Sequence, residues 1–301
     1  MSEFLQISFD LGPLPAETAE QACLECGASA ITFADARDEP VLEPAPGEFR
    51  LWPATRLQAL FAPDASPADT VRSLSEALGL PPGQLEVQRL ADRAWEREWL
   101  RDFHAMRFGE RLWICPHHEQ VEDPEARVVR LDPGLAFGTG THPTTALCLE
   151  WLDAHAPPAG EVIDYGCGSG VLALAAVRLG ARAAQCFDID PQALQATRDN
   201  AAANGLERRI HTRETAAALR APVALLMANI LSAPLVALAP RFAALVGRSG
   251  SILLSGLLEP QAPEVTAAYA PWFELHPFAT REGWVALSGT RTAAPPPGEP
   301  I

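Results

Sequence analysis

Three alternating glycines follow a short apolar segment near the middle of the chain, a pattern that lets a ligand approach bare backbone. The apolar segment is residues 162–165, and the glycines are Gly166, Gly168 and Gly170. Glycine readily adopts positive φ, and a helix that starts after such a turn directs free N–H groups at a bound ligand. Residues 171–179 are rich in alanine and leucine, so the sequence predicts a strand, a glycine turn and a helix.

The spacing around this turn separates the classes of nucleotide site. Asp188 and Asp190 follow about 20 residues after the turn, where nucleotide-binding folds place the carboxylate that holds a ribose. A dinucleotide site requires the pattern G-x-G-x-x-G, but Val171 occupies the position of the third glycine. The observed pattern is G-x-G-x-G with Asp164 two residues ahead of it, which disfavours a dehydrogenase. A turn that binds no ligand is the alternative.

The pattern resembles motif I of the Rossmann-like methyltransferases that use S-adenosylmethionine (AdoMet). The resemblance rests on the glycine triplet, on Asp164 before it and on a second predicted strand that runs into Asp188. Asp190 precedes Pro191, and proline is favoured at the first position of a helix, so we expect Asp190 to cap that helix. Asp188 is then the candidate ligand for the cofactor.

Strands and helices alternate along residues 107–291, which predicts a mostly parallel sheet with helices on both faces. Predicted strands run into the glycine turn, into Asp188 and into Asn229, and parallel strands place their carboxyl ends at one edge of the sheet. The last two predicted strands, residues 273–278 and 284–289, form a hairpin. The expected fold class is α/β, a Rossmann-like methyltransferase domain with a terminal hairpin.

The first third of the chain predicts a second, smaller domain. Residues 1–91 show the element order β-α-β-β-α-β, which is typical of a ferredoxin-like α+β domain. Residues 92–106 carry tryptophan and arginine at helical spacing and predict a connecting helix, with an ordinary helix inside one domain as the alternative. Residues 292–301 are rich in proline and predict a disordered tail.

The composition favours a cytoplasmic protein with a sizeable core. The 301 residues are 48% hydrophobic, yet no apolar run has the length of a membrane span, and the N-terminus lacks the pattern of a signal peptide. Six cysteines are scattered, and Cys167 lies inside the glycine turn, where a disulfide would interfere. A reducing compartment explains this usage, and we expect a cytoplasmic monomer that does not bind membranes.

The chain is acidic and contains no lysine. The formal net charge is −15, and residues 1–91 carry fourteen acidic against five basic residues. Direct nucleic-acid binding is not expected, because it normally requires a basic face, whereas a basic protein partner would be attracted. Solubility alone is the alternative reason for the charge. All 23 basic residues are arginine, which excludes P-loop NTPases, protein kinases of the usual pattern and Schiff-base enzymes.

Two clusters that contain cysteine are expected to be structural. Cys23 and Cys26 have the spacing of a redox motif, but they lie on a predicted helix with no following βαβ unit. Residues 115–119 include cysteine, histidine and glutamate, but no second cluster stands at zinc spacing. We therefore expect no metal.

Further motifs resemble the ribosomal protein L11 methyltransferase family (PrmA-type). They are Phe-Gly-Thr-Gly-Thr-His-Pro-Thr-Thr over residues 137–145, Asp-Ile-Asp-Pro over 188–191 and Ala-Asn-Ile-Leu over 228–231. The resemblance covers residues 107–290, and the first motif is far more specific than the glycine turn. It implies that the first domain recognises the substrate and that the second binds AdoMet.

The resemblance also implies a role for individual cofactor-binding residues. Gly166 and Gly168 lie against AdoMet, and Asp188 holds the ribose hydroxyls with both carboxylate oxygens. Thr145 belongs to the loop that covers the methionine portion of the cofactor. Asn229 follows the fourth strand, where it lies beside both the cofactor and the reacting centre.

Two residues are candidates for catalysis. The side-chain oxygen of Asn229 is a candidate acceptor for the hydrogens of a substrate amine, and a strand-end turn is its alternative role. His142 is a candidate general base because the unperturbed pKa of histidine suits proton transfer near neutral pH. A purely structural role, as the anchor of its loop, is the alternative for His142.

The reaction implied by the resemblance is methyl transfer from AdoMet to amines of a large-subunit ribosomal protein. The substrate is L11, free or within the large subunit, and the amines are lysine side chains and the N-terminal amine. The same chemistry on another protein or on a small molecule is one alternative. A non-catalytic AdoMet-binding module for ribosome assembly is another, which the complete set of motif residues disfavours.

Overall fold

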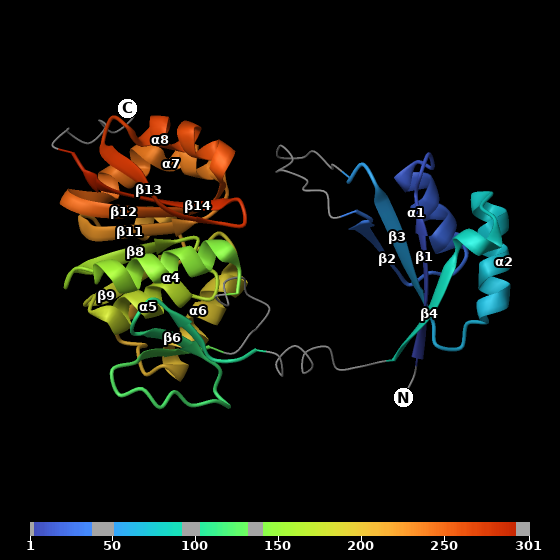
Figure 1. Cartoon of the computed structure of the whole chain (residues 1–301), viewed down its shortest axis with the longest axis horizontal. Helices are drawn as coiled ribbons and strands as arrows, with labels where there is room; N and C mark the ends of the chain where they lie inside the picture. The colour runs from blue at the N-terminus through green and yellow to red at the C-terminus, as the bar shows by residue number, and fades with distance from the viewer. Residues whose placement is uncertain (1–2, 38–50, 92–102, 132–140, 293–301) are drawn as a thin grey trace. The chain divides into compact units, whose positions relative to one another are not determined.

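The computed structural model describes residues 3–37, 51–91, 103–131 and 141–292. The chain divides into two compact units, Met1–Glu98 and Trp99–Ile301, each with its own buried apolar core (Figure 1). The division falls within residues 92–106, of which the structure describes 103–106. The predicted connecting helix therefore lies outside the described residues.

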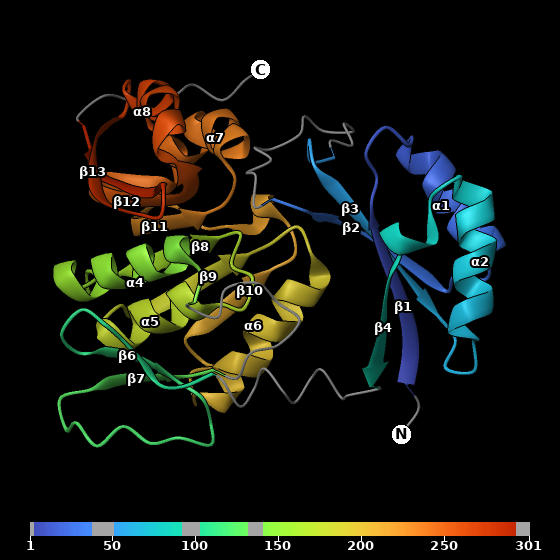
Figure 2. The ribbon, with the colours of Figure 1, turned by 45° about the vertical axis from the view of Figure 1, so that its right-hand side comes forward.

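The first unit is a four-stranded antiparallel sheet with two helices on one face (Figure 2). The strand order is β2-β3-β1-β4, which is the arrangement of the ferredoxin-like domain predicted from the sequence. The elements are β1 Glu3–Asp10, α1 Ala16–Glu25, β2 Ala30–Asp35, β3 Thr55–Phe61, α2 Pro67–Leu78, the 3-10 turn Pro82–Gln84 and β4 Glu86–Ala91.

The second unit contains a seven-stranded sheet in the order β10-β9-β8-β11-β12-β14-β13. Neighbouring strands are parallel except at β14, which runs antiparallel to both β12 and β13. The strands are β8 Glu161–Tyr165, β9 Ala183–Phe187, β10 Ile210–Arg213, β11 Val223–Asn229, β12 Val246–Leu258, β13 Phe273–Arg281 and β14 Trp284–Arg291. The predicted terminal hairpin is confirmed, and its second strand inserts between β12 and the first.

Helices cover both faces of this sheet, as the sequence predicts (Figure 1). Side chains of α4, α5 and α6 belong to one core cluster, and side chains of α7 and α8 belong to the other. Strand β8 contributes Val162 to the first cluster and Ile163 to the second, the alternation of a strand buried on both sides. The helices are α4 Pro143–His155, α5 Val171–Leu179, α6 Pro191–Ala203, α7 Ser232–Leu245 and α8 Ala262–Tyr269, with 3-10 turns Ala216–Ala218 and Glu259–Gln261.

A small sheet, β5-β6-β7, precedes these elements and packs into the same core as α5. Its strands are β5 Met106–Phe108, β6 Leu112–Cys115 and β7 Arg127–Arg130. At the other end of the chain, the N–H of Thr292 donates to the Trp272 carbonyl at 2.8 Å. Ordered chain thus extends one residue into the predicted tail, and residues 293–301 lie outside the described residues. No helix in the described part of the chain is long and apolar enough to span a membrane.

The parallel strands position the predicted site. Strand β8 ends at Tyr165, β9 ends at Phe187 and β11 ends at Asn229, and the three strands are neighbours in the sheet. The N–H of Gly166 donates to the Phe187 carbonyl at 2.7 Å, so the glycine turn and the segment that begins at Asp188 are held together. The carboxyl edge of the sheet therefore gathers residues from three separate stretches of sequence.

Candidate functional site

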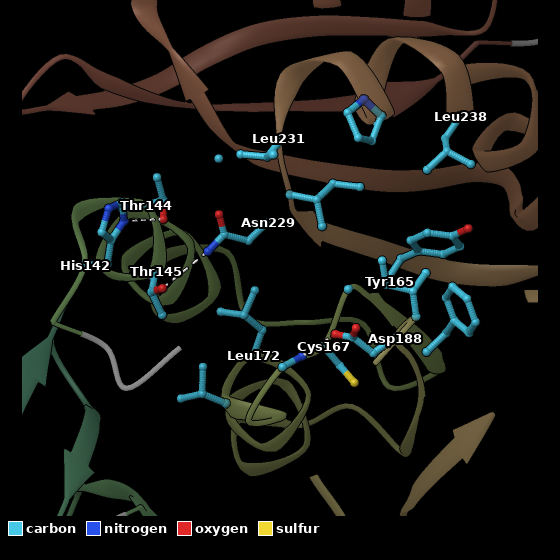
Figure 3. Close-up of a pocket in the computed structure, with 18 of the residues that line it drawn as sticks. His142, Thr144, Thr145, Tyr165, Cys167, Leu172, Asp188, Asn229, Leu231 and Leu238 are labelled. Atoms are coloured by element: carbon cyan, nitrogen blue, oxygen red, sulfur yellow. Dashed lines mark hydrogen bonds between the residues drawn. The ribbon is translucent and has the colours of Figure 1, made fainter. Parts of the chain in front are cut away.

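A cavity of about 660 Å³ lies at this carboxyl edge (Figure 3). Its wall contains every residue that the sequence predicts for the cofactor and catalytic site, namely His142, Thr145, Gly166, Gly168, Asp188 and Asn229. Most of the remaining wall is apolar and comes from β9, α5, α7 and the segment after β11. Asn229 and Thr145 lie toward one end of the cavity, and Asp188 and Tyr165 lie toward the other (Figure 3).

Glycine is required at the turn between β8 and α5. Gly166, Gly168 and Gly170 have φ values of +78°, +52° and +79°, a region that side chains of L-residues disfavour. A Cβ on Gly166 would collide with the side chain of Ile230, and a Cβ on Gly170 would lie 2.8 Å from Thr197. The turn therefore allows the segment after β11 and helix α6 to approach the backbone closely.

Two of the N–H groups at the start of α5 are engaged within the protein, which corrects the expectation of free donors at these two positions. The Val171 N–H donates to Ser169 Oγ at 3.3 Å, and the Ala173 N–H donates to Asp164 Oδ2 at 3.0 Å. The side chains of Ser169, in the turn, and of Asp164, in β8, thus accept two of the N–H groups of the first turn of α5. What the turn offers to a ligand is its shape, with no side chain in the way.

Asp188 is held by two backbone donors at the other end of the cavity. Its Oδ2 accepts the Gly168 N–H at 2.9 Å, and its Oδ1 accepts the Asp190 N–H at 3.0 Å. A carboxylate oxygen has two lone pairs, so each oxygen retains the capacity to accept a second hydrogen bond. Asp190 itself accepts the Gln192 N–H at 2.8 Å and caps α6, as predicted.

Asn229 and Thr145 form a hydrogen-bonded pair across the cavity wall. The Asn229 Nδ2 donates to Thr145 Oγ1 at 3.3 Å, and the Asn229 side-chain oxygen is directed away from Thr145 (Figure 3). Thr145 lies in the first turn of α4 and is 1% exposed, so the expectation that it belongs to a covering loop is wrong. A helix fixes the threonine more tightly than a loop would, and the threonine fixes the Asn229 amide.

His142 caps the start of α4. Its Nδ1 accepts the Thr144 N–H at 3.3 Å and lies 2.8 Å from Thr144 Oγ1, while its ring packs edge-on against Trp284 at 5.1 Å. Partial burial lowers the pKa of the imidazole, and the carboxylate of Glu282 opposes this only in part. The neutral ring therefore carries its proton on Nε2, and the Nδ1 lone pair is engaged by the helix.

A buried carboxyl stands behind the glycine turn. Asp164 is fully buried in β8; its Oδ2 accepts the Ala173 N–H, and its Oδ1 has no hydrogen-bond partner among the described residues. Burial raises the pKa of this carboxyl to about 7, the Ala173 N–H opposes the rise, and the charge of Asp188 adds to it. Asp164 is thus divided between two protonation states near neutral pH.

Several residues of the cavity wall carry no local signal of their role in the sequence. Gly256, from β12, has φ +87° and passes so close to the Ile230 carbonyl that a Cβ would collide with it. Trp284, at the start of β14, reaches the cavity only because this strand inserts beside β12. Leu231, by contrast, belongs to the motif over residues 228–231; it lies on the same wall and is 53% exposed.

The two clusters that contain cysteine, Cys23 with Cys26 and residues 115–119, do not line the cavity. Cys23 is buried in the first unit, and burial raises the pKa of its thiol to about 12, which makes it unreactive. Glu119 pairs with His104 Nδ1 at 2.6 Å, and this contact holds the pKa of Glu119 below its usual value. Across the described ranges, no group of three or more histidine, cysteine or acidic residues is arranged to hold a metal ion.

Fold and site together define a class of protein. The seven-stranded sheet has a single antiparallel strand next to its edge, a glycine turn after strand β8 and an acidic residue after β9. These features are those of the Rossmann-like AdoMet-dependent methyltransferases. Residues 3–292 match the family model described as ribosomal protein L11 methyltransferase (PrmA). The chain belongs to this family.

Individual relatives agree with this assignment. The chain is 49% identical over 291 residues to a ribosomal protein L11 methyltransferase of Pseudomonas aeruginosa (strain LESB58), covering 96% of this chain and 99% of the relative. It is 49% identical over 293 residues to the protein of the same name from Pseudomonas putida (strain W619), again with 96% and 99% covered. The crystal structure of a ribosomal protein L11 methylase from Lactobacillus delbrueckii subsp. bulgaricus aligns with TM-score 0.58 and 32% identity over 63% of this chain and 99% of that chain.

Asp164 predicts a pH dependence of stability. Its folded pKa of about 7 lies above the ordinary unfolded value, so between about pH 4 and pH 7 the unfolded chain loses this proton while the folded chain keeps it. Asp164 therefore lowers stability progressively as the pH rises through this window. We expect Asp164→Asn to gain stability relative to wild type on going from about pH 5 to about pH 8.

The measurement is urea unfolding of both proteins at the two pH values. Asp199→Asn is the matched control, because Asp199 is exposed on α6 and its Oδ1 accepts the Gln195 amide, as asparagine also can. A stability difference between Asp164→Asn and wild type that does not change with pH would contradict the raised pKa.

Proposed function

We propose that this chain is an AdoMet-dependent protein N-methyltransferase that acts on lysine side chains and on the N-terminal amine of ribosomal protein L11. The observation that carries the proposal is the Asn229–Thr145 pair, which sets an amide oxygen beside an apolar cavity whose other end holds Asp188. The chain matches relatives named ribosomal protein L11 methyltransferase over 99% of their length, which supports the choice of substrate.

The residues of the cavity fit AdoMet. The volume of about 660 Å³ is in the range of small-molecule sites. Asp188 would accept hydrogen bonds from the two ribose hydroxyls of AdoMet. The backbone of the glycine turn would lie directly against AdoMet. When bound, AdoMet supplies a methyl group on a positively charged sulfur that is already activated for transfer.

The protein's main task is then to prepare the amine. A free lysine has a pKa near 10.4, so only about one in a thousand is neutral at pH 7.4. The apolar wall around Leu231 and Leu172 disfavours a charged amine and lowers its pKa by desolvation. The amine therefore enters the reaction with its lone pair available.

Asn229 orients that amine. Thr145 Oγ1 accepts from the Asn229 Nδ2, so the amide cannot rotate freely and its oxygen stays available to accept an amine N–H. A single fixed acceptor directs the nitrogen lone pair, and alignment of nucleophile, methyl and leaving group is a large part of catalysis. His142 contributes by capping α4 and thereby fixing Thr145, and it is not required as a base.

The charge of the protein suits a basic partner. Residues 1–91 carry most of the acidic excess, and ribosomal proteins are commonly basic because they contact RNA. Complementary charge accelerates the association of two proteins, and this electrostatic attraction weakens as the salt concentration rises. We expect the first unit to provide this recognition surface.

Removal of the Asn229 amide is expected to affect turnover more than cofactor binding. Asn229→Ala should lower kcat by about 100-fold, as removal of one preorganised group does elsewhere, and change the AdoMet Kd by less than about threefold. The checks are single-turnover methylation and calorimetric AdoMet binding. Thr145→Val should show a weaker form of the same effect and Thr145→Ser almost none, because serine keeps the acceptor. Equal loss of kcat and affinity in Asn229→Ala is incompatible with the orienting role.

If His142 acts as an N-cap, another N-cap residue at this position should preserve activity. Asparagine is a preferred N-cap, so His142→Asn should keep kcat within about threefold, whereas His142→Ala should lose about 1 kcal/mol of stability. We expect the rate to rise with pH in both His142→Asn and the wild type, because the substrate amine must lose its proton. A flat pH–rate profile together with a large loss of kcat in His142→Asn would identify His142 as the general base instead.

The substrate is tested with radiolabelled AdoMet and total ribosomal protein from cells that lack this enzyme. We expect label on L11, in mass steps of one methyl group, on lysine and on the N-terminal amine. Label on another protein would refute the substrate and leave the chemistry intact. AdoMet binding without any transfer would refute the enzymatic proposal.

A further inference from the structure

A second cavity, of about 400 Å³, lies in the second unit away from the site described above. It is lined by Ala126, Arg127, Val128, Arg130, Val177, Arg178 and Arg209, none of which lines the first cavity. Arg178 is in the last turn of α5, whereas the first turn of α5 follows the glycine turn. The two cavities therefore lie at opposite ends of one helix, about 13 Å long.

The guanidinium groups of this cavity donate to neutral oxygens. Arg178 Nη2 donates to the Asn204 carbonyl at 2.7 Å, and Arg209 Nε donates to the Arg182 carbonyl at 2.8 Å. Arg130 Nη1 donates to the Pro116 carbonyl at 3.0 Å. Backbone carbonyls hold these side chains in place without neutralising their charge.

No carboxylate within the described ranges forms an ion pair with any of the four cavity arginines. Other arginines of the chain do form such pairs: Arg281 lies 2.8 Å from the Glu150 carboxylate and Arg56 lies 3.2 Å from that of Asp10. What distinguishes the cavity is that it gathers four such arginines at one place in a chain with a net charge of −15.

The cluster also holds an unused donor. The Nε of Arg178 is buried and has no hydrogen-bond partner in the part of the chain that the structure describes. Burial lowers the pKa of Arg178, and the neighbouring charge of Arg209 lowers it further. Concentrated positive charge costs free energy, and an anion in the cavity would offset that cost.

We propose that this cavity is a binding site for a small phosphate-bearing anion. Arginine forks match the oxygens of phosphate, and the cavity is concave and of the size of a small-molecule site. A long polyanion such as RNA would also meet the acidic remainder of the surface, whereas a small anion meets only the arginines. The site is independent of the proposed methyl transfer.

The test is calorimetric titration of the full chain with sodium pyrophosphate at fixed ionic strength, with AMP and a single-stranded RNA oligonucleotide as further probes. Arg127→Gln and Arg178→Gln should each weaken pyrophosphate binding by about tenfold or more. Arg127 is exposed on β7, so its substitution is not expected to unfold the protein, and circular dichroism checks this for both variants. AMP binding through the same arginines would extend the ligand class to nucleotides.

Arg198→Gln is the matched control, because Arg198 also lacks a carboxylate partner among the described residues and donates to Gln195 and Thr212 outside the cavity. It should bind pyrophosphate as the wild type does. Absence of binding to the wild type at millimolar pyrophosphate, or equal weakening in Arg198→Gln, would overturn the proposal. Binding of RNA but not of pyrophosphate or AMP would overturn the assignment to a small ligand.

Discussion

The second unit depends on one steric constraint: the chain between β8 and α5 has to turn without a side chain at three alternate positions. The absent Cβ atoms allow Ile230, which follows β11, and Thr197, from α6, to approach the turn. This proximity brings Asn229 and Asp188 to the same cavity, although they follow different strands. Side chains at the turn would separate these elements, and the cavity would lose both its shape and the alignment of Asn229 with Asp188.

Much of this fold is predictable from local sequence because its elements have strong local signals. The ferredoxin-like order, the α/β alternation and the terminal hairpin follow from periodicity and turn residues, and the Asp190 cap follows from Pro191 after it. The insertion of β14 between β12 and β13 is not predictable in this way, because strand order is set by pairing between distant segments. Strands β5 and β10 are three and four residues long, too short for periodicity to reveal.

The residues of the site also differ in whether local sequence predicts them. Residues predicted from motifs meet at one cavity because parallel strands align their carboxyl ends, a rule that needs no coordinates. Trp284 and Gly256 are missed because they arrive through the β12–β14 pairing. His142 is a candidate base from the sequence because its unperturbed pKa suits proton transfer, whereas its role as an N-cap is not expected because histidine is not among the common N-cap residues. The raised pKa of Asp164 depends on burial, which the sequence does not report.

Because Asp188 has two roles, the binding free energy lost on substituting it cannot be assigned to a single contact. Its two oxygens already receive the Gly168 and Asp190 N–H groups, so the same carboxylate braces the turn and faces the cavity. Affinity lost on truncating Asp188 is therefore the sum of a missing contact and a relaxed turn, and the two parts are not additive with substitutions at Gly168. Both variants lose the charge, but asparagine keeps one acceptor and alanine keeps none, so the difference between them measures the remaining brace without the charge. The carboxylate that we propose as a contact to the ligand is therefore also the group that holds the turn beside it.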